Sequence, residues 1–187
     1  MPWEMDDNLL EAERITAILA EKGIAAIVIG AVALAAHRYV RSTCDVDLGI
    51  DADLKRMRGL LEELRARGYQ AELHEPDGDD PLGGVIDIHG TFGLVQIVNF
   101  GERFPAAIRD SFSGEDIRTR PDGGLRVMPI PQLVALKLYA GGWKSLADIV
   151  ELLRRNPEAD LEMIGETWRN YRLSGWGKVL EELQREG

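Results

Sequence analysis

The stretch "GAVALAAHRYVRSTCDVDLGID", residues 30–51, decides the fold of this chain. It begins with a glycine that ends an apolar, β-branched run, continues through an alanine-rich segment that favours a helix, and closes on an alternating segment. Side chains two residues apart on a strand point the same way, so Asp45 and Asp47 share one face and Val46 and Leu48 the other. The stretch therefore predicts a strand, a turn and a helix that lead into a second strand with two carboxylates.

Two carboxylates on one face of a strand suit a hard divalent cation. Mg²⁺ takes oxygen ligands, keeps several waters, and is commonly held by one or two carboxylates together with substrate phosphates. Upstream, Gly30 and Ala31 stand where a strand turns into a helix. Small residues there let a phosphate approach the free backbone N–H groups of the helix start. The pattern predicts a phosphate-binding turn beside a site for a divalent metal.

Composition and length favour an ordinary globular protein. The chain has 187 residues, 45% of them hydrophobic and 29% charged, which fits one domain over residues 1–187. A net charge of -10 disfavours broad, non-specific binding to nucleic acid. The single cysteine, Cys44, excludes an intramolecular disulfide and a Cys-rich zinc site. The sequence has no signal-peptide pattern and no apolar run near the ~20 residues of a membrane helix, so we expect a cytoplasmic protein with no membrane partner.

The first half of the chain alternates between helical and extended patterns. Apolar spacing predicts a helix over residues 7–22 and another over residues 51–68. Asp51 and Asp53 form a second Asp-x-Asp motif, but they lie at the start of the second helix, where aspartate caps free N–H groups. We therefore interpret these two acids as helix caps and not as metal ligands.

The second half predicts a hairpin followed by helices. Residues 85–90 and 94–100 alternate in polarity around a short turn, which is typical of paired strands. Residues 113–131 indicate a connector with one further strand. The expected layout is α+β, with the sheet-containing catalytic part over residues 24–128 and a helical part over residues 131–187.

These motifs resemble the nucleotidyltransferase superfamily that includes DNA polymerase beta and, within it, the abortive-infection toxin nucleotidyltransferases. In that superfamily a strand, a Gly-Gly or Gly-Ser turn and an alanine-rich helix lead into an Arg-x-Thr-x-Asp-x-Asp strand. The resemblance covers roughly residues 24–155. It implies a polymerase-beta-like fold and the transfer of NMP from an NTP to a hydroxyl acceptor, with Mg²⁺ or Mn²⁺ as cofactor. The matching residues here are Gly30, Ala33, Arg41, Thr43, Asp45 and Asp47.

The resemblance continues into two later helices. The family has a Leu-x-x-x-Lys helix followed by a helix with an aspartate, and "QLVALKLYA" and "SLADIVELL" look like that pair. In the glycine turn and near these two helices, three positions depart from the family pattern: Ala31 stands for Gly or Ser, Ser145 for a frequent aspartate, and Trp143 lies near a usual arginine. The residues implied to contact the nucleotide are Gly30, Ala31, Arg41, Thr43, Lys137 and Asp148.

Several of these side chains also have purely structural interpretations. Arg41 either contacts phosphate or pairs with an acid near the strand. Lys137 lies in an otherwise apolar helix, where a charge needs a partner, a phosphate or a path to water. Asp148 near a helix start is also a favourable dipole partner. His37 and His74 have no partner at metal-ligand spacing, and we interpret both as structural or solvated.

A third carboxylate, which family members bring from a later strand, is missing from its expected place. Gln96 stands there, and glutamine cannot act as a general base. If Gly90 pairs with Gly93 in the hairpin, however, Asp87 lies directly across from Gln96 on the same face. We therefore predict Asp87 as the third catalytic and metal-binding acid beside Asp45 and Asp47.

The sequence leaves the acceptor open between a tRNA or other RNA end, a protein hydroxyl and a small molecule. Arg118, Arg120 and Arg126 form the best basic patch for an RNA. The alternative function is a catalytically weak or inactive nucleotide-binding or regulatory protein, paired with a small protein partner in a toxin–antitoxin or defence system. Gln96 and Ala31 support this alternative.

Overall fold

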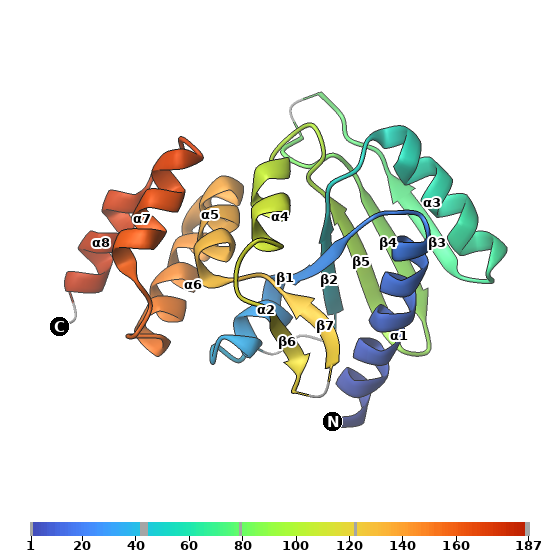
Figure 1. Ribbon diagram of the computed structural model, residues 1–187, viewed down its shortest axis with the longest axis horizontal. Coiled ribbons are helices and arrows are strands. Elements are labelled where there is room, and N and C mark those ends of the chain that lie inside the picture. The colour runs from blue at the N-terminus through green and yellow to red at the C-terminus, as the bar shows by residue number, and fades with distance from the viewer. Residues whose placement is uncertain (1, 42–44, 79, 122, 186–187) are drawn as a thin grey trace.

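A mixed seven-stranded sheet forms the centre of the computed structural model, which describes residues 2–41, 45–78, 80–121 and 123–185 (Figure 1). The strand order is β3-β4-β5-β2-β1-β7-β6. The strands are β1 (Ala26–Ile29), β2 (Asp45–Ile50), β3 (Gln70–His74), β4 (Val85–Gly90), β5 (Gly93–Asn99), β6 (Ile117–Arg120) and β7 (Gly123–Val127). The helices are α1 (Pro2–Glu21), α2 (Gly30–Ala36), α3 (Leu54–Ala66), α4 (Pro105–Ser111), α5 (Ile130–Ala140), α6 (Gly142–Arg155), α7 (Leu161–Asn170) and α8 (Trp176–Gln184).

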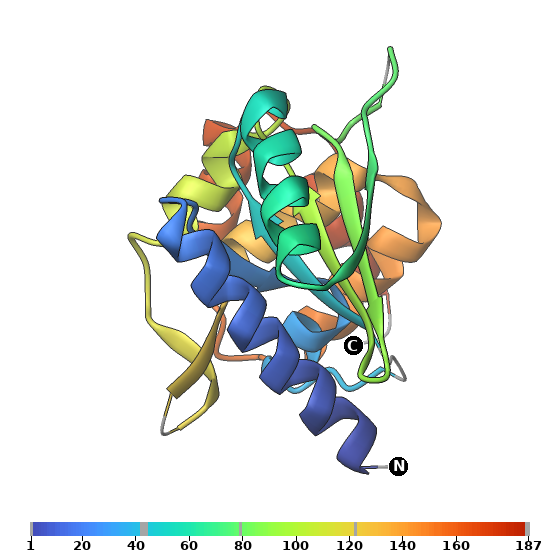
Figure 2. The same ribbon diagram turned by 90° about the vertical axis from the view of Figure 1, so that its right-hand side faces the viewer.

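The two faces of the sheet have different coverings. Helices α1 and α3 lie side by side over one face, as Figure 2 shows. Alternate strand residues point into this layer, and Val46, Leu48 and Ile97 are fully buried in it. The opposite face carries the alternating polar residues of β2, β4 and β5, while α2 and α4 contact β2. The polar face is therefore the one on which chemistry can be placed.

The helical part packs against the sheet part through aromatic side chains. The ring of Phe104, just before α4, lies 4.7 Å from that of Tyr139 and meets Tyr171 edge-on at 5.1 Å, measured between centroids. Trp176 at the start of α8 is buried. These contacts hold α5 and its neighbours at a fixed place beside the sheet (Figure 1). None of the helices formed by the described residues is long and apolar enough to cross a bilayer.

The α+β class, the mixed sheet and the hairpin are confirmed. Strands β4 and β5 pair with Gly90 opposite Gly93 and Asp87 opposite Gln96, which is the predicted register. The first helix is longer than predicted and begins at Pro2. Thr43 and Cys44 lie outside the described residues.

Two sequence predictions are wrong. Residues 113–131 contain two strands, because Gly123 and Gly124 have φ angles of 141° and 83° and let β6 turn back into β7. Strand β7 then pairs in parallel with β1. Asp51 does not cap α3: the cap is Asp53, whose carboxylate accepts a hydrogen bond from the Arg56 N–H, while Asp51 pairs with Arg109 at 2.5 Å.

A buried amide ties the strand ends together below the site. The Asn99 side chain is 1% exposed and bridges three segments of backbone. Its Nδ2 donates to the carbonyls of Ala52 and Gly83, each at 2.9 Å. Its Oδ1 accepts from the N–H groups of Ala52 and Gly101, each at 3.0 Å. Four backbone groups therefore depend on one side chain for their partners.

We predict that Asn99→Ala lowers the free energy of unfolding by about 3 kcal/mol, because buried backbone groups lose their partners without gaining water. Chemical denaturation monitored by circular dichroism measures this loss. Asn170→Ala, at an exposed position ending α7, is the control and should change stability by less than about 0.5 kcal/mol. Equal stability of the two variants would contradict the role given to Asn99.

Candidate active site

The centre of the site is the contact between Gly30 and Asp47. Strand β1 ends at Ile29, which pairs with Asp47 of β2, and α2 begins at the next residue. Gly30 has φ +64°, a conformation that side chains rarely adopt. A Cβ built on Gly30 would lie 1.9 Å from Oδ2 of Asp47. The strand-to-helix turn therefore packs directly on the carboxylate and requires glycine.

Asp45 and Asp47 lie together on the polar face of β2, as predicted, with Val46 and Leu48 buried on the other face. Burial and, to a smaller extent, the charge of Asp45 raise the pKa of Asp47 from 3.8 to about 6, although the charge of Lys137 acts in the opposite direction. The two carboxylates thus share a partly desolvated space. A divalent cation would relieve the cost of holding two negative charges there.

A buried carboxylate forms ion pairs with two cationic side chains of the site. The Asp148 side chain, on α6, is 6% exposed. Its Oδ2 accepts hydrogen bonds from Arg41 Nη1 at 2.7 Å and from Lys137 Nζ at 2.8 Å. The Tyr39 hydroxyl donates to Oδ1 at 3.3 Å, and burial followed by the Asp148 charge raises the Tyr39 pKa. The structure thus joins Arg41, Lys137 and Asp148, three of the predicted nucleotide residues, in one network.

Asp87 lies on the same face, two strands from Asp47. In register across the sheet, Asp47 pairs with Gln96 and Gln96 with Asp87. The Gln96 amide donates to Asp87 Oδ1 at 2.7 Å, and His74 Nε2 lies 3.2 Å from Oδ2. Both carboxylate oxygens of Asp87 therefore have neighbours that fix the orientation of the group. Its catalytic and metal-binding roles stay predictions.

The carboxylates of the site form an incomplete set of metal ligands by themselves. Among the described residues, no three His, Cys, Asp or Glu side chains converge as ligands of one ion. The pair Asp45 and Asp47 fits the way Mg²⁺ is held in sites where substrate phosphates and water complete the coordination. The residues therefore suit a cation that arrives together with a phosphate substrate.

Of the remaining predicted residues, one lies next to the Gly30–Asp47 contact and one lies outside the described residues. Ala31 follows Gly30 in the first turn of α2 and is half-buried. Thr43 falls between two described segments. The sequence did not indicate Tyr39 or His74 as site residues. A hydroxyl or an imidazole acquires such a role only from partners far away in sequence, which no local pattern encodes.

Comparison with solved structures gives the fold family. The solution structure of the antibiotic-resistance factor ANT(2″)-Ia aligns over 97% of this chain and 98% of its own, with a TM-score of 0.57 and 14% identity. A crystal structure of ANT(2″)-Ia in complex with adenylyl-2″-tobramycin aligns over 88% of this chain and 96% of its own, with a TM-score of 0.58 and 14% identity. The chain has the nucleotidyltransferase fold. No family model and no curated protein matches the sequence.

Within the nucleotidyltransferase fold, we predict that Gly30→Ala disrupts the site. The positive φ should cost about 1–2 kcal/mol, and the new methyl group should displace Asp47. Thermal denaturation and Mg²⁺-dependent nucleotide binding measure the two effects. The matched control is Gly59→Ala, at an exposed position inside α3 where a Cβ would meet no atom within 4 Å beyond the adjoining residues and the backbone of its own helix. It should raise stability by up to about 1 kcal/mol and leave binding unchanged. Normal binding by the Gly30 variant would contradict the packing described.

We predict that Asp47→Asn stabilises the metal-free protein in a pH-dependent way. A pKa raised from 3.8 to about 6 means that the native state loses about 3 kcal/mol as pH rises from about 4 to about 6. The amide cannot ionise, so the stability gain should be fully present above pH 6 and absent below pH 4. Denaturation in chelator across this range measures it. Added Mg²⁺ should stabilise the native chain and not the variant, whereas a constant difference at every pH would contradict the assignment.

Proposed function

We propose that the protein transfers a nucleoside monophosphate from an NTP to a hydroxyl acceptor. The observation that carries the proposal is the pair of carboxylates on β2, of which Asp47 packs against the Gly30 turn beside Asp45, with the charge of Lys137 acting on Asp47. Opposite charges arranged in this way suit a triphosphate that arrives with its metal. The nucleotidyltransferase fold supports the same reaction class.

Each group has a proposed role in holding the triphosphate. Asp45 and Asp47 hold Mg²⁺ or Mn²⁺, which when bound neutralises phosphate charge. Lys137 and Arg41 contact phosphate oxygens, and Gly30 and Ala31 allow the triphosphate to approach the backbone. Asp148 is a positioning residue, because it holds both cations and its own oxygens are occupied by them. Thr43 completes the proposed set on the sequence motif alone.

The transfer step needs a proton acceptor. The hydroxyl oxygen of the acceptor molecule attacks the α-phosphorus of the NTP. The bond between the α-phosphorus and the oxygen that bridges it to the β-phosphorus then breaks, and pyrophosphate leaves with the electron pair. We propose that Asp87 receives the hydroxyl proton, with Gln96 and His74 keeping its carboxylate oriented. Gln96 replaces the acid that the superfamily pattern places on this strand, so Asp87 is the nearest carboxylate along the paired row.

Among the acceptors left open by the sequence, we favour a small molecule with a hydroxyl group. The net charge is -10, and two of the three arginines of the basic patch are already paired, Arg118 with Asp116 and Arg120 with Glu13. These pairs lower the positive potential offered to an RNA backbone. ANT(2″)-Ia, a structural neighbour of similar length, was solved in complex with a small molecule, adenylyl-2″-tobramycin.

A second candidate is a nucleotide-binding regulatory protein with weak or no transfer activity. The observation that favours it is Gln96 opposite Asp47, with the Asp87 carboxylate bound to its neighbours. In this candidate function the protein belongs to a toxin–antitoxin or defence system and has a small protein partner, in keeping with the resemblance of its sequence motifs to abortive-infection toxins. Nucleotide binding without any labelled product would favour it.

We predict that Asp45→Asn lowers the rate of transfer by about a thousandfold or more, since metal-assisted charge stabilisation is worth several kcal/mol. Labelled NTPs with Mg²⁺ and a panel of small hydroxyl compounds, total RNA and the protein itself provide the assay. Asp53→Asn is the matched control, because Asp53 belongs to the second Asp-x-Asp and asparagine also caps helices. Full activity of the Asp45 variant would refute the proposed reaction centre.

A further inference from the structure

Trp143 is 85% exposed, the highest value among the large hydrophobic side chains that the structure describes as exposed. It lies in the first turn of α6, the helix that carries Asp148. By contrast, Trp176 is buried and Trp168 packs against the core. An indole left in water at this place contributes little to the stability of the chain itself.

The two helices that fix the Lys137–Asp148 ion pair also fix Trp143. Lys137 is in the last turn of α5, and Trp143 follows after the turn formed by Gly141 and Gly142. These glycines have φ angles of 72° and 81°, which other residues rarely adopt. The ion pair between α5 and α6 at 2.8 Å therefore sets where the indole stands relative to the proposed phosphate-binding lysine.

Trp143 and Lys137 line one cavity of about 340 Å³. Leu138 and Leu146 add apolar surface, and Ser174 and Lys178 bring hydrogen-bond donors from the α7–α8 side. A wall that combines an indole, aliphatic groups and a few donors suits a flat heterocycle with polar edges. Lys137, to which the proposed function assigns a phosphate contact, is therefore also part of the wall of this cavity.

We infer that Trp143 stacks on the nucleobase of the bound NTP. The inference rests on the proposed function, because it places the triphosphate at Asp45, Asp47 and Lys137 and extends the nucleotide toward α6. Stacking on an indole uses the π-face that every base has, so it adds affinity for all four nucleotides. Ser174 and Lys178 can form hydrogen bonds to the polar edge of the base, and these bonds would make the affinity differ among the four nucleotides.

The test compares the nucleotide with its phosphate part alone. Isothermal titration of the full chain with Mg²⁺ and each of the four NTPs, and with Mg²⁺ and inorganic tripolyphosphate, gives the two sets of Kd values. Trp143→Ala should weaken NTP binding about tenfold and leave tripolyphosphate binding unchanged. Trp143→Phe keeps an aromatic face and should recover most of the lost affinity. In the native chain, NTPs should quench tryptophan fluorescence and tripolyphosphate should not.

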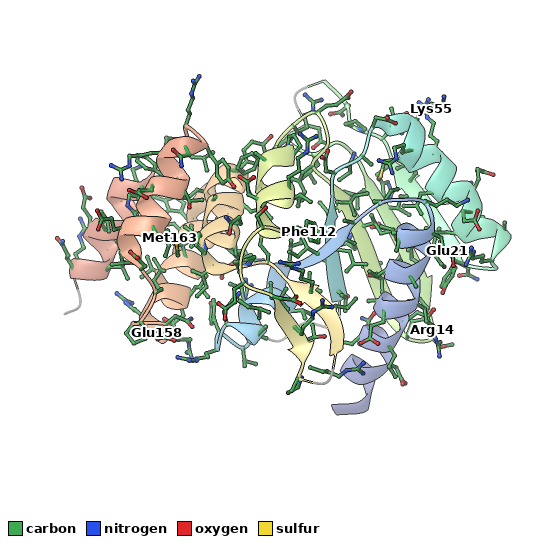
Figure 3. All side chains as sticks on the ribbon, in the orientation of Figure 1. Arg14, Glu21, Lys55, Phe112, Glu158 and Met163 are labelled. Carbon is green, nitrogen blue, oxygen red and sulfur yellow. The ribbon has the colours of Figure 1, made fainter. Side chains whose placement is uncertain are left out.

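Met163→Ala is the matched control, since the Met163 side chain is apolar and 49% exposed. Met163 lies on α7, in the helical part of the molecule, and is labelled in Figure 3. It should change neither Kd. NTP binding that is equal in the native chain and the Trp143→Ala variant would overturn the inference and leave the proposed function standing. Equal weakening of NTP and tripolyphosphate would also overturn it. If the native chain binds neither probe, the proposed function fails and the inference fails with it.

Discussion

The close packing of the Asp47 carboxylate on the Cα of Gly30 is the constraint on which the rest of the site depends. It brings the end of β1, the start of α2 and the middle of β2 within contact distance, and no residue with a Cβ fits there. The burial to which this packing contributes, together with the charge of Asp45, raises the pKa of Asp47 to about 6. Holding two negative charges close together at this site therefore lowers the free energy of unfolding. Such a cost is typical of a functional site.

Asp148 connects the sheet to the helical part electrostatically. It is buried, and it binds Arg41 from the segment between α2 and β2 together with Lys137 from α5. Removal of either cation would leave a buried charge with less compensation, which is strongly unfavourable. The helical part is consequently more than a cover for the sheet. It supplies one wall of the candidate site and fixes its positive charges relative to the two acids of β2.

The parts of this structure that were predictable from sequence follow local patterns. Alternation placed Asp45 and Asp47 on one face, and an even turn at Gly90–Gly93 set Asp87 opposite Gln96. Strand β6 is not predictable from its own residues, because glycines and prolines indicate a connector there, whereas antiparallel pairing with β7 supplies the partner that makes it a strand. The neighbours of Asp148 and the Asp87–His74 contact join residues far apart in sequence or on different strands. Their prediction requires the tertiary arrangement.

The parallel pairing of Val28 with Val127, reinforced by the hydrogen bond from the Met128 N–H to the Val28 carbonyl, has a consequence for how the molecule forms. Strand β7 is synthesised about a hundred residues after β1, so the pairing of these two strands closes a very long loop. Loop closure of this kind slows folding and leaves an apolar strand edge open on the nascent chain. Until then, β1 can pair on one side only, with β2. Completion of the sheet is thus a late event, and an emerging chain is exposed to chaperones or to aggregation through that edge.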